Sequence, residues 1–426
     1  MTVKELIARS KAAQAAFAFA TQEQADAAAR AICKVVYDNA EKLGPMAAEE
    51  SRMGSEQDKI AKCRNKSALI WESLKDKKSC DIINRIEERR MIEVAKPVGV
   101  VASIIPSTNP VVTPMSNGAF ALKCRNSVIF APHPRAVKCT KLLVEMFRAE
   151  LKKLGLPEDL VLGLEEVSND LTSELMSAAD MVVATGGMGM VKAAYSSGKP
   201  AIGVGQGNVQ CIIDEDADIA DAVGKIIIGR AFDNGLICLG EQTVFVPEDK
   251  EAEFVAEMKK QGGYLVEGEE NVDKLREGLF PGGDAFSRVV VGMFADQVSD
   301  EIGLGAPKGT RVLFAKAKAL GAGDVLCREK LCPVIAYMTY KTFKEGVAMM
   351  EANLEHEGKG HSIAVHSNTP ENVEYAAIRC CVSRVVVNQP SGTTGGGSPT
   401  NGFTPTTTLG CGTWGNNSFA GNLNYE

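Results

Sequence analysis

From Val98 onward, short β-branched runs alternate with stretches whose apolar residues recur at helical spacing. Val98 to Ile105 predicts a strand closed by Pro106, and a helix over 114–123 and a strand over 128–131 follow it. The alternation continues with helices over 136–154, 171–178 and 189–197 and with strands over 160–164 and 181–184. Repeated strand and helix units predict an α/β fold, in which a mainly parallel sheet is covered by helices on both faces.

A turn-rich segment, Asp233 to Gly240, interrupts this alternation and marks the expected domain boundary. It lies between a predicted helix over 217–232 and a predicted strand over 242–246. A second alternating set follows, with helices over 249–261, 342–352 and 370–378 and strands over 311–315, 333–340, 361–367 and 384–388. We therefore expect a second α/β domain.

The two ends of the chain have different residue patterns from the middle. Residues 3–90 carry apolar positions at helical spacing among many charges, which predicts several surface helices. Residues 391–417 are crowded with Gly, Thr, Ser and Asn, which is typical of a linker or tail. Phe403, Leu409 and Trp414 within that segment favour an ordered, packed loop instead.

The composition limits which partners the chain can have. The formal net charge of -7 includes no block of like charge, which argues against a nucleic-acid groove or a basic membrane face. No stretch reaches the ~18 apolar residues of a membrane span, and the N-terminus lacks the apolar run of a signal peptide. The 12 cysteines form no C-x-x-C pair, and the 4 histidines lie at no zinc spacing with them. We expect a cytoplasmic protein without a metal.

Among the cysteines, Cys238 stands apart because it lies in the glycine-punctuated loop between a helix and a strand. Such a loop presents a side chain rather than burying it, which suits a catalytic nucleophile. A cysteine between Ile237 and Leu239 is more often a small core residue. Local context leaves both interpretations open.

Two further loops follow predicted strands. Thr185-Gly186-Gly187 lies between a strand and a helix, an arrangement that presents backbone N–H groups and a positive helix end to a phosphate, although a tight turn explains it equally well. Asn109 follows the strand that ends at Ile105, where ligand clefts of open α/β sheets form. Its amide is a candidate oxyanion donor, and a simple helix cap is the alternative.

Taken together, these segments closely resemble the aldehyde dehydrogenase superfamily, and specifically its CoA-acylating branch, over nearly the whole chain. The most specific pieces are Pro132-His-Pro-Arg135, the run from Ala184 to Pro200, Asp233-Asn-Gly-Leu-Ile-Cys238 with Glu241-Gln242, Glu329-Lys-Leu-Cys-Pro333 and Thr408-Leu-Gly-Cys-Gly-Thr-Trp-Gly415. The resemblance implies a nicotinamide-cofactor-binding domain over 1–233, a catalytic domain over 234–411, and a return segment over 412–426 that begins an arm joining subunits as a homodimer or homotetramer.

The resemblance also assigns roles. Cys238 matches the nucleophile, Asn109 the oxyanion amide, and Glu329 the acid that holds the nicotinamide ribose of NAD or NADP. The residues expected along the cofactor are Pro106, Ser107, Thr108, His133, Pro134, Arg135, Thr185, Gly186, Gly187, Gly205, Glu329 and Leu331.

One departure from the hydrolytic members implies a different acyl acceptor. Those members carry a glutamate that activates water, and Gly203 stands at or beside that position here. Without the carboxylate, attack by water on the thioester should be slow, so the CoA thiol is expected to take the acyl group.

The range of expected substrates is narrowed by three segments of the chain that resemble particular acylating enzymes. Val111 to Met115, Arg384 to Pro390 and Asn401 to Pro405 most resemble enzymes for succinate semialdehyde and sulfoacetaldehyde, whose tails are anionic. The candidate residues for substrate or CoA are His361, Gln389, Ser391, Thr393 and Thr394, with Arg384 as a further anion candidate. A tight turn explains the 389–397 loop equally well, and a structural role is the simpler account of His361.

Several rival functions stay open at this point. They are an acylating enzyme for acetaldehyde or propanal, a hydrolytic aldehyde dehydrogenase, an acyl-phosphate semialdehyde reductase, and a non-catalytic scaffold with the same fold. The intact Cys238, Asn109 and Glu329 argue against the scaffold.

Overall fold

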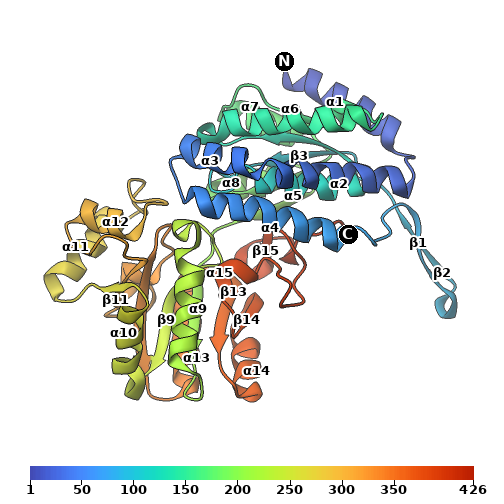
Figure 1. Ribbon diagram of the computed structural model, residues 1–426. Coiled ribbons are helices and arrows are strands. Elements are labelled where there is room, and N and C mark those ends of the chain that lie inside the picture. Colours follow the sequence, from blue (N-terminus) through green and yellow to red (C-terminus); the bar gives the residue numbers. More distant parts are fainter.

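A computed structural model describes residues 1–426 as two α/β lobes, each built on a parallel sheet (Figure 1). The first sheet has the order β5-β4-β3-β6-β7 and the second the order β10-β11-β12-β9-β8-β13-β14. Every neighbouring pair in both sheets is parallel. The predicted α/β class with two sheet-based lobes is therefore confirmed.

The first lobe is a three-layer unit. Its strands are β3 (Val100–Ile104), β4 (Ser127–Ala131), β5 (Val161–Gly163), β6 (Met181–Thr185) and β7 (Ala201–Val204). Its helices are α1 (Val3–Phe17), α2 (Gln22–Asp38), α3 (Ala40–Ser51), α4 (Glu56–Leu74), α5 (Val112–Lys123), α6 (Val137–Lys153), α7 (Asn169–Ala178) and α8 (Met188–Tyr195). Alternate strand residues face opposite layers: Val101 packs with α2 and α5, whereas Val100 and Ala102 pack with α1 and α7.

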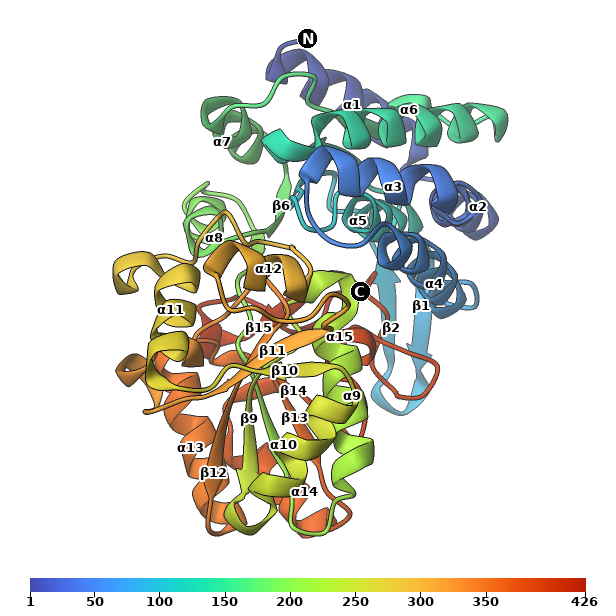
Figure 2. The same ribbon diagram turned by 60° about the vertical axis from the view of Figure 1, so that its left-hand side comes forward.

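The second lobe repeats this plan. Its strands are β8 (Val209–Ile213), β9 (Glu241–Pro247), β10 (Gly263–Leu265), β11 (Val312–Lys316), β12 (Val334–Tyr340), β13 (Gly360–His366) and β14 (Val382–Val387). Its helices are α9 (Ile219–Ala231), α10 (Glu251–Lys260), α11 (Glu269–Leu279), α12 (Ala295–Ile302), α13 (Phe343–His356), α14 (Pro370–Arg379) and α15 (Ser391–Thr394). Figure 2 shows these helices around the second sheet, below the first lobe.

The chain passes between the two sheets earlier than the predicted boundary after residue 233. Strand β8 lies between β9 and β13 in the second sheet, although it precedes residue 233. Its sequence, Val-Gln-Cys-Ile-Ile, contains three β-branched residues, and all five residues are buried. By sheet membership the boundary falls between Val204 and Val209, and the turn-rich segment at 233–240 lies inside the second lobe.

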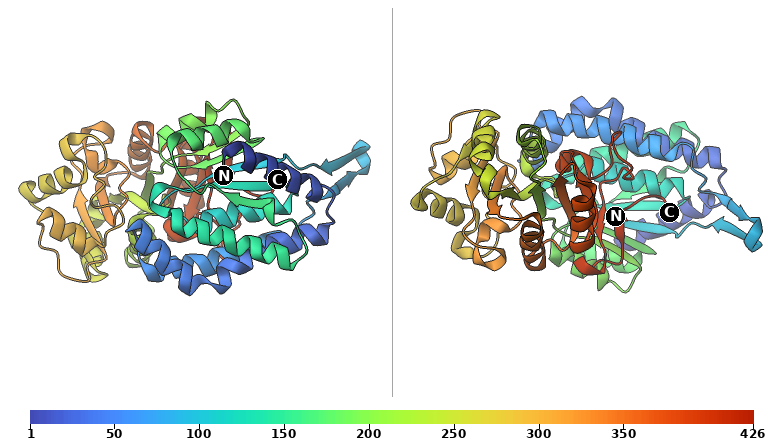
Figure 3. Two further views of the ribbon diagram at one scale, coloured as in Figure 1. Left: turned by 90° about the horizontal axis from the view of Figure 1, so that it is seen from above. Right: turned by 90° about the horizontal axis from the view of Figure 1, so that it is seen from below.

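The expectation of helices over 3–90 is correct for α1 to α4 but wrong for the last part. Residues 81–95 form an antiparallel hairpin of β1 (Asp81–Ile86) and β2 (Met91–Ala95), which projects away from the first lobe (Figure 3). Arg90 takes a positive φ of 52° at the turn, and the local pairing of alternating apolar residues favours strands over a helix.

Residues 391–417 form an ordered loop, as their apolar residues indicate. Helix α15, β15 (Leu409–Cys411) and buried Thr406 and Thr408 lie within it, and β15 pairs with β16 (Ala420–Asn422). None of the helices is both long and apolar enough to cross a membrane.

Candidate active site

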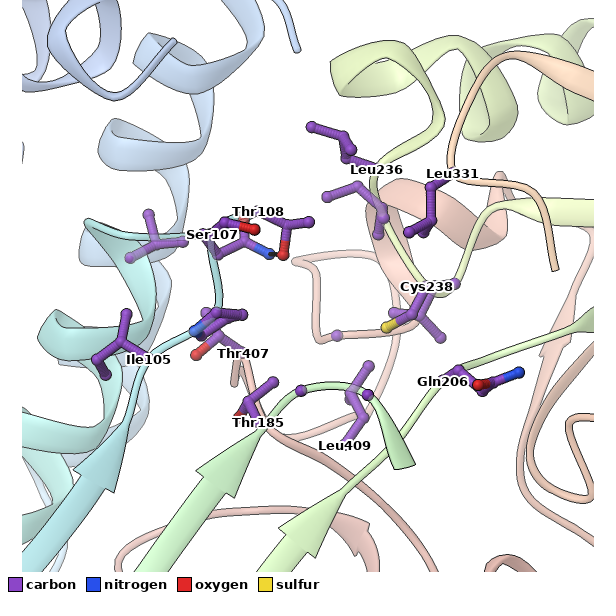
Figure 4. Close-up of a pocket in the computed structure, with 18 of the residues that line it drawn as sticks. Ile105, Ser107, Thr108, Thr185, Gln206, Leu236, Cys238, Leu331, Thr407 and Leu409 are labelled. Carbon is purple, nitrogen blue, oxygen red and sulfur yellow. Dashed lines mark hydrogen bonds between the residues drawn. The ribbon is translucent and has the colours of Figure 1, made fainter. Parts of the chain in front are cut away.

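A cavity of about 1200 Å³ lies where the two lobes meet (Figure 4). Loops that follow β3, β4, β6 and β7 form its first-lobe wall, together with α4. Segments around Cys238, Glu329 and the 392–399 loop form the opposite wall. The cavity thus lies beyond the carboxyl ends of the first sheet, where open α/β sheets bind ligands.

The structure brings most of the predicted site residues to this one cavity. Those that line it are Pro106, Ser107, Thr108, Asn109, His133, Pro134, Thr185, Gly186, Gly187, Gly205, Cys238, Glu329, Leu331 and Thr393. Those that do not are Arg135, His361, Gln389, Ser391 and Thr394.

Cys238 presents its sulfur to the cavity, on the wall opposite Thr108 (Figure 4). Burial first and the Glu329 carboxyl second raise the pKa of its thiol to about 12, and Arg384 acts in the opposite direction. The thiol of the ligand-free protein is therefore protonated near neutral pH.

The loop that carries Cys238 is held by an unusual backbone. Asp233, Asn234 and Gly235 take positive φ values of 48°, 53° and 71° in succession. Two of them are not glycine, so their conformation needs compensation from the surroundings. Buried hydrogen bonds supply it: the Asp233 carboxylate accepts from the Ser55 N–H at 3.0 Å, and Asn234 donates to the Gly292 carbonyl at 2.9 Å.

Asn109 reaches the cavity from the loop after β3, with its amide oxygen engaged behind it. Lys62 of α4 donates to Asn109 Oδ1 at 2.7 Å. The amide nitrogen makes only a long contact of 3.5 Å with Thr108 Oγ1, so it retains donor capacity. An amide N–H on a cavity wall that faces a thiol suits a developing oxyanion.

Two features of the cavity fit a nicotinamide dinucleotide. They are the turn from Thr185 to Gly187 and the carboxyl group of Glu329. Gly187 is the N-cap of α8, and a Cβ placed on it would meet nothing within 4 Å, so the backbone is open to a phosphate. Glu329 accepts from the Gly207 N–H at 2.9 Å, and burial raises the pKa of its carboxyl to about 8. Its other oxygen is available to a ribose hydroxyl.

The comparisons with known proteins agree with this geometry. Residues 1–274 match the family model described as the aldehyde dehydrogenase family. The succinate-semialdehyde dehydrogenase (acetylating) of Clostridium kluyveri is 49% identical over 426 residues, which are 100% of this chain and 94% of that protein. The chain belongs to the aldehyde dehydrogenase family. Its relatives place it in the acylating branch.

Other relatives extend this likeness. The sulfoacetaldehyde dehydrogenase (acylating) of Bilophila wadsworthia is 39% identical over 431 residues, covering 100% of this chain and 93% of that protein. The crystal structure of an acetylating aldehyde dehydrogenase from Geobacillus thermoglucosidasius superimposes with a TM-score of 0.96 at 36% identity, covering 99% and 93% of the two chains. A propionaldehyde dehydrogenase from Rhodopseudomonas palustris, solved with bound CoA and an acylated cysteine, gives 0.87 at 26% identity over 100% and 94%.

In this aldehyde dehydrogenase, Gly203 lies away from the cavity, inside β7. Its N–H donates to the Tyr195 hydroxyl at 3.0 Å, and a Cβ on it would lie 3.0 Å from the Tyr195 ring. The carboxylates that do line the cavity are Glu329 and Glu357. Both oxygens of Glu357 accept hydrogen bonds, from Gln206 and from the Glu329 N–H, whereas one oxygen of Glu329 stays open to the cavity.

His361 of β13 lies behind the nucleophile loop rather than on the cavity wall. Neither ring nitrogen has a hydrogen-bond partner, although the side chain is buried. Burial, with a contribution from Arg384, lowers the pKa of its imidazole well below the usual value, so the ring is neutral. A Cβ on Gly207 would overlap the Cys238 carbonyl oxygen and lie 3.0 Å from the His361 ring, so Gly207 keeps the two close.

The remaining anion candidates have structural partners. Arg384 is buried and donates to the carbonyls of His361 and Gly410 and to Ser362 Oγ. Gln389 contacts Thr400 and Asn401 at the surface of the loop. Of this group only Thr393 faces the cavity.

Sequence reasoning missed the lysines of α4. Lys62 and Lys66 line the cavity, and Lys59 lies one turn before Lys62. Lys66 donates to the carbonyls of Gly396 and Gly397 at 2.8 and 3.5 Å and forms no ion pair. Their spacing at 59, 62 and 66 places them on one helix face together with the apolar residues Cys63 and Ile70, which are buried. Lysines on the apolar face of a helix are unusual, and that pattern in the sequence could have marked them as functional.

Proposed function

We propose that this aldehyde dehydrogenase oxidises a short aldehyde with an anionic tail to its CoA thioester, reversibly, through a thioester on Cys238. The observation that carries the proposal is the meeting of Cys238 and Asn109 across one cavity, with the dinucleotide-type turn at 185–187 on the same cavity. The likeness to acylating relatives over the whole chain supports the same reaction.

In the oxidative direction, the Cys238 thiolate attacks the aldehyde carbon, and the Asn109 amide N–H donates to the resulting oxyanion. The bound nicotinamide supplies the hydride acceptor as the oxyanion collapses to a thioester. The CoA thiolate then attacks the thioester carbonyl, and the Cys238 thiolate leaves as acyl-CoA forms. The same Asn109 N–H stabilises the oxyanion of this second addition.

Both additions require a thiol to lose its proton. Because burial holds the Cys238 thiol protonated, a neutral base is needed nearby. His361 is the candidate, since its ring is neutral, has two unpartnered nitrogens and lies against the nucleophile loop, and the burial that lowers its pKa makes it a weak base in the ligand-free protein. We assign it to proton transfer for the Cys238 or CoA thiol.

The cavity disfavours hydrolysis of the thioester. Of the two carboxylates on its wall, Glu357 accepts from the Gln206 side chain and the Glu329 N–H, and Glu329 accepts from the Gly207 N–H. We assign the remaining Glu329 oxygen to the nicotinamide ribose, which leaves no carboxylate oxygen on the wall to activate water. The CoA thiol is the better nucleophile that remains.

The anionic tail is supported by charge as well as by relatives. Lys66 lies on the cavity wall without a carboxylate partner, and an ammonium group in that setting is best stabilised by an anion. The relatives named for succinate semialdehyde and sulfoacetaldehyde act on aldehydes that carry a carboxylate or a sulfonate.

We also infer that the chain forms a homodimer or homotetramer. The β1–β2 hairpin pairs with no other strand and exposes Ile82, Met91, Ile92 and Val94 by 40%, 47%, 53% and 49%. A two-stranded hairpin is only marginally stable alone in water, so a second copy is the natural cover.

The test is an assay of NADH or NADPH formation with succinate semialdehyde, sulfoacetaldehyde, acetaldehyde and propanal, each with and without CoA. We expect CoA-dependent turnover that is fastest with the two anionic aldehydes, and no turnover in Cys238→Ala. Turnover without CoA would refute the acylating proposal, and a preference for acetaldehyde or propanal would refute the anionic substrate.

A further inference from the structure

Three lysines of α4 reach toward the meeting of the two lobes, and two of them share one buried carboxylate. Lys59 and Lys62 both donate to Asp233 Oδ2, Lys59 at 3.2 Å. Their side chains are 3% and 7% exposed, and that of Asp233 is 0% exposed. Two ammonium groups therefore share one carboxylate directly, and the Asp58 carboxylate, which accepts from the Asp233 N–H, is the next anion beside them.

Lys62 makes a second contact that Lys59 does not make. Its Nζ donates to Asn109 Oδ1 at 2.7 Å, whereas the second contact of Lys59 is with the Thr108 carbonyl at 3.4 Å. An ammonium group only donates, so it fixes which end of the Asn109 amide faces it. With the oxygen held by Lys62, the amide nitrogen is left with only the 3.5 Å contact to Thr108 Oγ1, and Asn109 and Thr108 both line the cavity.

We propose that Lys62 is a positioning residue that orients the Asn109 amide for oxyanion binding and increases the polarity of its N–H. This inference rests on the proposed function, because Asn109 has an oxyanion to bind only if Cys238 attacks a carbonyl. A hydrogen bond from an ammonium group to the amide oxygen polarises the amide, which strengthens the bond that its N–H donates.

The same ammonium group also connects the two halves of the site. Asn109 belongs to the loop after β3 of the first lobe, and Asp233 lies five positions before Cys238 in the second. The Asp233 N–H in turn donates to the Asp58 carboxylate at 2.9 Å, at the start of α4. Helix α4 therefore fixes the position of the Asn109 loop relative to the loop that carries Cys238.

The test compares Lys62→Met with Lys59→Met. Each variant removes one ammonium group and leaves Asp233 paired with the other lysine, but only Lys62→Met releases the Asn109 amide. We expect Lys62→Met to lower kcat by about 10- to 100-fold, as loss of a charged hydrogen bond does, with unchanged KM for CoA and nucleotide. Lys59→Met should lower the melting temperature to a similar extent while keeping most of the turnover.

A double-mutant cycle separates positioning from a general structural effect. Asn109→Ala alone should lower kcat by about 10²- to 10³-fold. Adding Lys62→Met to it should cost little more, since the lysine acts through the amide that is gone. Lys62→Arg, which keeps a donor at the same place, should recover part of the lost turnover.

Three outcomes would overturn the role of Lys62: full turnover in Lys62→Met, an equal loss in Lys59→Met, or losses that multiply in the double variant. If Lys62→Met fails to fold, Lys62→Gln, whose shorter and uncharged side chain can donate only a weaker bond, replaces it in the same cycle with a smaller expected loss of kcat. Failure of the proposed function has a different signature, because the unmodified protein would then form no acyl-CoA at all.

Discussion

Lys66 shows how one side chain can set which aldehydes the cavity accepts. Its ammonium group is held in place by two backbone carbonyls, so its position is fixed while its charge stays uncompensated. Burial lowers its pKa to about 8. It is therefore charged below pH 8 and loses that charge as the pH rises above it, which ties the binding of an anion to pH.

We expect Lys66→Met to lower kcat/KM for succinate semialdehyde by roughly 30-fold or more, as removal of one member of a buried ion pair does. Butanal has a similar length and no charge, so its kcat/KM should change little. In the unmodified protein, KM for succinate semialdehyde should rise above pH 8 and KM for butanal should not. Equal losses of kcat/KM for both aldehydes would show that Lys66 acts on the Cys238 thiol or on the fold. Lys66→Arg is the matched control, because it keeps a positive charge at this position.

Cys238 differs from an ordinary exposed thiol because its environment favours the protonated form. With a pKa raised to about 12, its thiolate fraction in the ligand-free protein should grow about tenfold per pH unit from pH 7 to 10. Alkylation by iodoacetamide, followed by mass spectrometry of the Cys238 peptide, should rise with that slope and show no plateau. A plateau near pH 8.5 would mean that the thiol is not held protonated; exposed Cys381 provides the internal comparison.

The residues that sequence reasoning found are those whose identity depends on local motifs. Cys238, Asn109 and Glu329 lie in short segments with a recognisable pattern, and all three reach the cavity. Lys62 and Lys66 could not be found in this way, because their roles arise from contacts with residues 47 and 330 positions away. Gln389 was expected near the substrate from composition, but backbone geometry turns it toward Thr400 instead.

At the scale of elements, the backbone conformation of residues 233–235 determines how the following residues present Cys238 to the cavity. Gly235 has φ 71°, and a Cβ on it would lie 2.6 Å from the backbone carbon and oxygen of Cys332. That close approach needs a glycine, since backbone atoms on the neighbouring segment cannot move aside as a side chain can. The loop and the Cys332 segment are therefore matched to each other.

Gly235→Ala should destabilise the protein by about 1–3 kcal/mol and move the nucleophile loop, so kcat should fall more than the loss of stability alone explains. Gly303→Ala is the matched control, because its φ is 77° but a Cβ there would meet nothing within 4 Å. The control should cost about 1 kcal/mol and keep full turnover. Thermal unfolding and steady-state kinetics measure the two effects, and normal kcat in Gly235→Ala would contradict the coupling.

Strands with a helix on either side were predictable, and the exceptions have physical reasons. β3, β4, β9 and β13 coincide with runs rich in β-branched residues that are bounded by turns, so the sequence pattern was sufficient to predict them. β7 and β8 were missed because Gly203, Gly205 and Gly207 interrupt the apolar pattern, and the absence of β8 moved the expected boundary past α9. The β1–β2 hairpin was missed because charged residues interrupt its alternation, so that a surface helix fitted equally well.

At the scale of the whole molecule, the cavity depends on both lobes. The cofactor-type turn comes from the first sheet and the nucleophile from the second, while α4 contacts both. The hairpin, by contrast, contributes no residue to the cavity. It projects from the first lobe (Figure 3). Its apolar side chains can therefore be changed without touching the chemistry.

If the hairpin joins subunits, charges placed on it should separate them. We expect Ile92→Glu combined with Val94→Glu to shift the molar mass in light scattering toward that of one chain, because burying two carboxylates in an apolar interface costs several kcal/mol. Ile378→Glu is the control for added surface charge: it places one carboxylate at a residue that is 81% exposed on α14, in the other lobe. An unchanged mass in the hairpin variant would place the subunit contact elsewhere, and retained CoA-dependent turnover in the separated chains would show that each cavity is complete within one chain.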